Sequence, residues 1–195
     1  MKLKNKILVV SRSSKLAISY DQAKTWTVVQ NGLAAPAENG AMAEGNGVII
    51  GVAFDHSTGQ GSITRSSDNG VSWSAINYGN TLGEWSLRVH FDGSEFVLFS
   101  GGNTWKSKDG LKWTVVPMKI DGVNAPSYWR AATEYNPRTK MFVGILSVYN
   151  GEGDKQKAYR SPDGINWTTV APDKFKGGTA ILAMTIGEME SKFCP

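Results

Sequence analysis

The chain has 195 residues, which is enough for one domain with its own hydrophobic core and too few for two ordinary domains. Its composition, 41% hydrophobic and 19% charged, excludes a disordered or fibrous chain. The net charge of +4 comes from basic residues scattered along the sequence, so no nucleic-acid partner is predicted.

The first residues do not fit an export signal. After a basic start, the apolar run 7–10 is far shorter than the roughly 7 to 15 residues that such a signal needs. No apolar run approaches the roughly 20 residues of a membrane-spanning helix. We therefore expect a protein made in the cytoplasm, with no export signal and no membrane span. Cys194 is the single cysteine, which excludes an intrachain disulfide.

In chain order, apolar and alternating runs separated by turn residues predict four groups of short strands. The expected strands are 6–11, 15–19 and 27–29 in the first group, 41–43, 48–54 and 74–76 in the second, 85–91, 95–99 and 114–116 in the third, and 129–135, 140–146 and 168–170 in the fourth. The third and fourth groups follow the same plan, because each has a tryptophan six residues before an aromatic residue and then a polar turn. A last run, 179–185, begins no complete group of its own.

Each group contains one copy of a short repeated motif. The copies are the segments 19–26, 66–73, 107–113 and 161–167, and each has Ser, then Asp two residues later, then Trp. The spacings between successive tryptophans are 47, 40 and 54 residues, which bracket the roughly 40 to 50 residues of one propeller blade. Asp and Ser side chains bond nearby amides in turns and Gly supplies positive φ, so each copy predicts a β-hairpin turn.

These copies resemble the Asp-box family, also called BNR repeats, whose pattern is Ser-x-Asp-x-Gly-x-Thr-Trp. The first copy departs from the pattern only at Ala23 and the second only at Ser72, while the third and fourth are one residue shorter. The family occurs in sialidases and in many non-enzymatic propellers. The resemblance therefore implies an all-β fold, a small β-propeller of about four four-stranded blades.

We expect a single repeat domain over residues 1–195. The predicted blades are approximately 6–30 together with 179–185, then 40–77, 85–117 and 129–171. In this arrangement the C-terminal strand at about 179–185 completes the first blade and closes the ring, which removes exposed sheet edges. The alternative is an open arc of four blades that pairs with another copy to form a larger ring.

In the family the Asp-box residues lie on outer hairpins, away from the axis where ligands bind, so a structural role is expected for them. The residues concerned are Ser19, Asp21, Trp26, Ser66, Asp68, Gly70, Trp73, Ser107, Asp109, Gly110, Trp113, Ser161, Asp163, Gly164 and Trp167.

Sialidases of this family hold the substrate carboxylate with three arginines and also use a Tyr-Glu nucleophile pair and an acidic proton donor. Here Arg65 and Arg160 immediately precede a box serine and Arg138 lies in a turn. Of the six arginines, only Arg88 and Arg130 fall on predicted inner strands, so a converging trio is not visible. The Arg-Ile-Pro signature of the family is also absent. We therefore expect no enzyme activity and no catalytic residues.

No cofactor or metal is expected, because His56 and His90 are the only histidines and neither lies in a dense cluster of ligands. The best candidate binding surface is the end of the ring where two predicted inner strands begin. It carries Trp85, Arg88, Trp129 and Arg130. Aromatic faces with nearby donors can hold a sugar or a side chain of a partner. Alternatively, the two tryptophans plug the central channel.

These features favour a non-catalytic structural or recognition module whose partners are proteins of an assembly, a surface glycan or further copies of the chain. Asp-box domains also occur in bacteriophage capsid, tail and fibre proteins, and the resemblance together with the missing export signal predicts a virion component. Two alternatives stay open, a sialidase-type glycoside hydrolase and an intracellular assembly factor.

Overall fold

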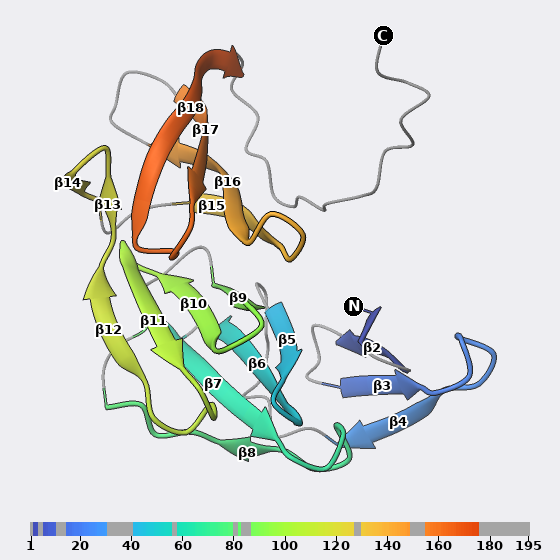
Figure 1. The fold of residues 1–195 in the computed structure, drawn as a ribbon. Coiled ribbons are helices and arrows are strands. Elements are labelled where there is room, and N and C mark those ends of the chain that lie inside the picture. Colours follow the sequence, from blue (N-terminus) through green and yellow to red (C-terminus); the bar gives the residue numbers. More distant parts are fainter. Residues whose placement is uncertain are drawn as a thin grey trace, which may run out of the picture.

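The computed structural model describes residues 2–3, 6–10, 15–30, 41–55, 58–79, 82, 87–126, 130–148 and 155–175. Every regular element in this part of the chain is a β-strand, and consecutive strands pair antiparallel into sheets that follow the sequence order. Figure 1 shows these sheets one after another in an arc, from the N-terminal sheet to the fourth. The all-β prediction is therefore confirmed.

The first two sheets contain the first two predicted groups of strands, together with two strands that those groups did not include, 2–3 and 60–66. Sheet 1 has the order β1-β2-β3-β4, and sheet 2 has the order β5-β6-β7-β8. Their strands are β1 (Lys2–Leu3), β2 (Lys6–Val10), β3 (Lys15–Ser19), β4 (Thr27–Gln30), β5 (Ala41–Gly45), β6 (Val48–Asp55), β7 (Gln60–Ser66) and β8 (Ser74–Ala75).

Sheets 3 and 4 repeat this plan, and sheet 4 is extended. Sheet 3 contains β9 (Arg88–Phe91), β10 (Phe96–Ser100), β11 (Asn103–Ser107) and β12 (Thr114–Pro117), paired in that order. Sheet 4 contains β15 (Arg130–Asn136), β16 (Met141–Val148), β17 (Lys155–Ser161) and β18 (Asn166–Phe175). The hairpin β13 (Lys119–Ile120) and β14 (Val123–Asn124) adds to the outer edge of β18, where β13 pairs parallel to it.

The predicted closing strand, 179–185, lies outside the described residues. At the edge of β2 where that strand was expected, the structure places β1, which pairs Lys2 with Ile7 and Leu3 with Lys6. The short N-terminal hairpin therefore gives sheet 1 four strands of its own.

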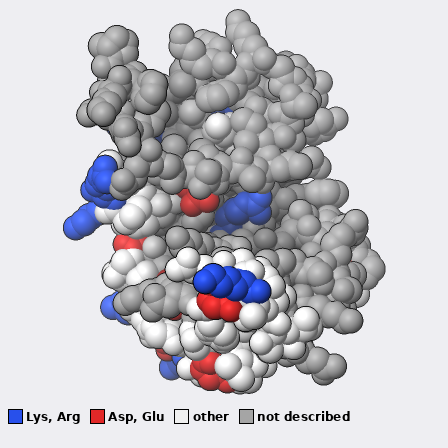
Figure 2. Space-filling view, turned by 90° about the vertical axis from the view of Figure 1, so that its right-hand side faces the viewer, with Lys and Arg blue, Asp and Glu red and all other residues white. Residues whose placement is uncertain are grey.

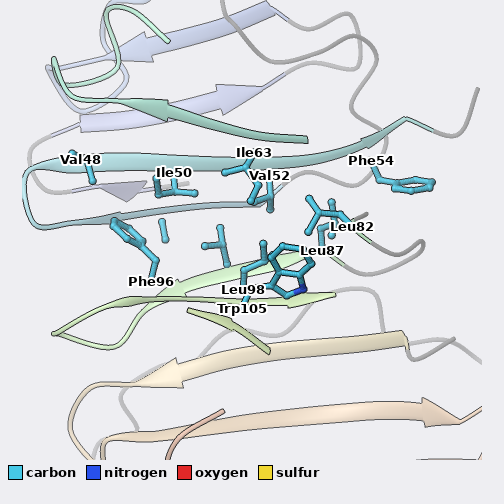
Figure 3. Packing of buried hydrophobic residues seen from close by; sticks show 12 residues of the cluster. Val48, Ile50, Val52, Phe54, Ile63, Leu82, Leu87, Phe96, Leu98 and Trp105 are labelled. Atoms are coloured by element: carbon cyan, nitrogen blue, oxygen red, sulfur yellow. The ribbon is translucent and has the colours of Figure 1, made fainter. Parts of the chain in front are cut away.

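The core lies between successive sheets. A first cluster joins sheet 2 to sheet 3 and includes Ile50, Phe96, Leu98 and Trp105, each at most 2% exposed. Figure 3 shows side chains of β6 and β7 facing those of β10 and β11 across this junction. A second cluster joins sheet 3 to sheet 4 and consists of Val97, Phe99, Met118, Phe142, Tyr159 and Trp167. Sheet 3 therefore packs on both of its faces, because adjacent residues of a strand point to opposite sides.

Candidate functional site

The four Ser-Asp-Trp copies form four equivalent turns, which we call the box turns (19–26, 66–73, 107–113 and 161–167). In the second, the Ser66 hydroxyl donates to Asp68 Oδ1 over 2.8 Å and accepts from the Gly70 amide over 2.8 Å. Asp68 Oδ1 also accepts from the amide of Ser72 over 2.9 Å. The same Ser-to-Asp bond and amide-to-Ser bond occur in the other three turns.

These bonds favour the charged form of the aspartates. The hydroxyl and amide of Thr25 lower the pKa of Asp21 from 3.8 to about 2, and those of Ser72 do the same for Asp68. The amides of Leu111 and Lys112 lower the pKa of Asp109. Because each carboxylate accepts hydrogen bonds from its own turn, the box turns stabilise the fold locally.

The site that the structure assembles lies at the inner edge of the junction between sheets 3 and 4. Strand β9 contributes Arg88 and His90, which are two residues apart and so share one face of the strand. Strand β15 contributes Thr133 and Glu134. His90 Nε2 lies 2.9 Å from Thr133 Oγ1, and this hydrogen bond joins the two inner strands.

Burial and charge set the protonation of this group. His90 is 11% exposed and its ring packs beside Phe99 and Phe142, with centroid distances of 6.0 and 6.1 Å. Burial, and next the charge of Arg88, lower the pKa of His90 from 6.5 to about 4, so the imidazole is neutral at pH 7.

Arg88 and Glu134 carry the charges of the site. Glu134 is 34% exposed, and its Oε2 lies 3.9 Å from His90 Nδ1. Burial raises the pKa of Glu134 and lowers that of Arg88, and in each case the opposite charge of the other residue counteracts the shift. The Arg88 guanidinium also donates to the carbonyl of Leu87 over 2.9 Å. The inner edge thus presents the Arg88 cation and the Glu134 anion at partly buried positions, where charges interact more strongly than in water.

Of the four residues predicted to bind, Arg88 is the one whose side chain the structure describes. Trp85, Trp129 and the side chain of Arg130 lie outside the described residues, although Arg130 itself begins β15. Sequence reasoning missed His90, Thr133 and Glu134. A signal was present in the sequence, since His90 and Glu134 each immediately precede the aromatic residue of the plan that the third and fourth groups share, Phe91 and Tyr135.

Three further arginines lie on outer strands or in a turn. Arg65 is on β7, and its Nε donates to the carbonyl of Asp109 in the next box turn over 2.8 Å. Arg138 is in the turn between β15 and β16, and Arg160 is exposed on β17. None of these three is on an inner strand.

No group of three or more His, Cys, Asp and Glu side chains among the described residues is placed to hold a metal ion. Within the same residues, no helix has the length and apolar character needed to cross a membrane.

No family model matches this sequence, and no curated protein matches it. The fold, however, is similar to solved structures. The structure of YjhT is matched with a TM-score of 0.68 at 11% identity, over 90% of this chain and 65% of that one. YCF48 bound to D1 peptide is matched with a TM-score of 0.58 at 14% identity, over 84% of this chain and 49% of that one.

A glycoside hydrolase, the GH74 enzyme of Niastella koreensis, is also similar, with a TM-score of 0.56 at 17% identity, over 84% of this chain and 24% of that one. The chain thus corresponds to between a quarter and two thirds of the length of these three proteins. They are β-propellers, and the one from Niastella koreensis is an enzyme. Four consecutive antiparallel sheets and these similarities establish that the chain has a small β-propeller fold.

Proposed function

We propose that the chain is a non-catalytic recognition module that binds a segment of another protein at the inner edge between sheets 3 and 4. The observation that carries the proposal is the His90–Thr133 hydrogen bond, which holds the strands bearing Arg88 and Glu134 together. A rigid pair of opposite charges can bind a partner that offers a carboxylate to Arg88 and a donor to Glu134.

One of the comparisons supports a protein partner. One similar propeller, YCF48, was solved bound to D1 peptide. A propeller presents the ends of its inner strands on one face of a rigid disc, which suits capture of an extended segment. A glycan is the second candidate, because another similar propeller is a glycoside hydrolase.

A peptide-display library screened with the purified chain tests this proposal. We expect the recovered peptides to contain an acidic residue and to bind Arg88→Ala at least about tenfold more weakly in calorimetry, the loss of one charge-assisted contact. Arg138→Ala, in the turn between β15 and β16, is the matched control and should bind as the wild type does. Equal binding by wild type and Arg88→Ala would reject this site. The same comparison on a glycan array tests the second candidate.

The non-catalytic part of the proposal rests on the placement of the arginines. Arg65, Arg138 and Arg160 lie on outer strands or in a turn, so none of these three shares an inner strand with Arg88. We expect no turnover of a fluorogenic sialoside. Turnover that disappears in Arg88→Ala or Arg130→Ala would establish the sialidase alternative instead.

The resemblance to bacteriophage Asp-box domains extends the proposal to a place in a virion. Mass spectrometry of purified particles should then detect the chain at a fixed copy number per particle. If particles lack the chain while a pull-down from infected cells recovers it with capsid or tail precursors, the assembly-factor alternative holds.

A further inference from the structure

The turn between β5 and β6 contacts sheet 3 through one side chain. The turn consists of Asn46 and Gly47, whose φ angles of +50° and +76° are of the kind that a tight two-residue hairpin turn requires. The side-chain amide of Asn46 donates to the carbonyl of Ser94 over 3.3 Å and to the carbonyl of Lys108 over 3.0 Å. Ser94 lies in the turn between β9 and β10, and Lys108 lies in the box turn 107–113. We call these two hydrogen bonds the Asn46 tie.

The Asn46 tie belongs to the packing between sheets 2 and 3. It joins residues that are 48 and 62 positions apart in the sequence. Gly45, the residue before the turn, has no room for a Cβ, because Phe91 of β9 occupies that space. The hairpin therefore lies directly against sheet 3, and the amide of Asn46 bonds the sheet at the end of this contact.

An asparagine that precedes a glycine can lose its amide without a catalyst. The backbone nitrogen of the glycine gives up its proton to water and attacks Cγ of the asparagine. The bond between Cγ and Nδ2 then breaks, and Nδ2 leaves as ammonia. Water opens the resulting succinimide ring at one of its two carbonyls, which gives aspartate or isoaspartate. Glycine favours the attack because it has no Cβ to hinder the approach.

The surroundings of Asn46 and Gly47 permit this reaction. Both residues are exposed, and no atom lies within 4 Å of the position that a Cβ on Gly47 would take. The two bonds of the Asn46 tie are exposed as well, so water replaces them whenever the turn lifts from sheet 3. The released side chain can then turn towards the Gly47 nitrogen.

A second Asn-Gly pair, in the second box turn, is held against the same reaction. Asn69 is exposed and has a φ of +65°, so it resembles Asn46. Gly70, however, is buried, and its amide donates to the Ser66 hydroxyl over 2.8 Å. This bond keeps the Gly70 nitrogen from losing its proton and from moving towards Cγ of Asn69. The other Asn-Gly pairs, at 31–32, 39–40 and 150–151, lie outside the described residues.

We propose that Asn46 is a site of spontaneous deamidation, at which the ageing protein loses the Asn46 tie between sheets 2 and 3. A carboxylate has no N–H to donate, and its oxygens repel the carbonyls of Ser94 and Lys108. Isoaspartate also lengthens the backbone of a turn that has only two residues. Acidic and basic side chains lie side by side on the face that Figure 2 shows, and the net charge is +4, so one further carboxylate adds little repulsion overall. The effect on stability therefore comes from the lost contacts.

Peptide mapping by mass spectrometry tests the reaction on the full chain, stored folded at mildly alkaline pH and sampled over weeks. We expect the mass change from amide to acid to accumulate at Asn46 at least about tenfold faster than at Asn69, because Gly70 must first leave a buried hydrogen bond. In urea the two rates should converge, since both local structures are then lost. Equal rates in the folded chain, or no mass change at Asn46, would overturn the proposal.

Thermal unfolding of Asn46→Asp tests the consequence. Asn69→Asp is the matched control, because it adds the same charge at another exposed residue with a positive φ. We expect Asn46→Asp to lower the Tm by about 2 to 4 °C through loss of the tie, and Asn69→Asp to leave the Tm nearly unchanged. Stored wild-type chains that are modified at Asn46, separated by ion exchange, should have a Tm lowered at least as far. If Asn46→Asp is as stable as Asn69→Asp, the Asn46 tie does not hold the two sheets together and the proposal fails.

Discussion

Gly110 shows how one residue sets the distance between two sheets. Its φ is +75°, a conformation that residues with a Cβ adopt at a cost, and the space for a Cβ is occupied by Ile50. Gly47 has nearly the same φ, +76°, with no atom within 4 Å of an added Cβ. Gly47 therefore has only the requirement for a positive φ, whereas Gly110 also has the requirement for close packing against Ile50.

We therefore expect Gly47→Ala to lower the free energy of unfolding by about 1 kcal/mol, the conformational cost alone. Gly110→Ala should cost about 2 to 4 kcal/mol because overpacking adds to it. Urea denaturation measures both values. Shortening the neighbour in Gly110→Ala/Ile50→Val should recover part of the packing loss. If Gly47→Ala and Gly110→Ala lower the free energy of unfolding equally, the close contact between Gly110 and Ile50 does not affect stability.

The lowered pKa values of the aspartates in the box turns predict that the protein loses stability in acid. The folded pKa of Asp21 and of Asp68 is about 2, below the usual 3.8, so folding favours their charged forms. This contribution is complete above about pH 4 and is lost as the pH falls toward 2. Urea midpoints at pH 2 to 5 should fall steeply for the wild type and less steeply for Asp21→Asn/Asp68→Asn. If the urea midpoint falls equally steeply with pH in the wild type and the double variant, the turn hydrogen bonds do not lower the pKa values of these two carboxylates.

At the scale of elements, the inner strands β9 and β15 are joined through His90, which is neutral when folded. Its folded pKa of about 4 is below the 6.5 of an unfolded histidine, so the unfolded chain takes up a proton first as the pH falls. The stability that depends on neutral His90 is thus complete above about pH 6.5 and decreases between pH 6.5 and 4. Burial is the larger cause of this lowered pKa, and Arg88 adds to it by repelling the imidazolium.

We expect His90→Gln to remove most of the pH dependence of unfolding between pH 6.5 and 4, measured by urea denaturation. The amide cannot be protonated in this range, yet it can still bond Thr133. Thr133→Val is the comparison, and it should cost about 1 kcal/mol for one buried hydrogen bond while keeping the pH dependence. A wild-type protein whose stability is flat over this range would contradict the burial of a neutral His90.

The hairpin β13–β14 illustrates an element that its neighbours hold in place. The amides of Lys119 and Asp121 bond the carbonyls of Ile165 and Trp167, and the Asp121 carboxylate accepts from the amide and the hydroxyl of Thr169. The strands are only two residues each, too short to be stable alone. The link between sheets 3 and 4 is therefore ordered by sheet 4.

At the scale of the whole molecule, sheet 3 couples its neighbours because its two faces belong to two core clusters. Leu98 contributes to the cluster shared with sheet 2, and Phe99 to the cluster shared with sheet 4. A loss on one face of sheet 3 is therefore expected to reach the other junction.

Leu98→Ala should lower the free energy of unfolding by about 2 to 5 kcal/mol, the cost of a cavity in a fully buried site. Trp105 and Trp167 report on the two junctions when the other tryptophans are replaced by Phe. Their fluorescence should show the same lowered transition in Leu98→Ala. Separate transitions would mean that the sheets unfold independently.

The four-sheet plan could be predicted from the sequence, because the Ser-Asp-Trp turn is a local structure. Its hydrogen bonds join residues two to four apart, so the spacing of Ser19, Asp21 and Ala23 already specifies them. Apolar runs between the turns then set the strands, and Arg88 could be assigned to the start of an inner strand for the same reason. The predicted extent of the domain, residues 1–195, and its closing strand at 179–185 stay predictions.

What only the tertiary structure decided concerns residues far apart in sequence. His90 and Thr133 are 43 residues apart, and Arg65 and Asp109 are 44 apart, so their contacts depend on how one sheet stacks on the next. The same stacking determines which faces are covered, and it leaves Trp26 exposed while burying Trp167 in an equivalent turn. A local pattern specifies a turn wherever it occurs, but burial depends on whether another sheet packs against it.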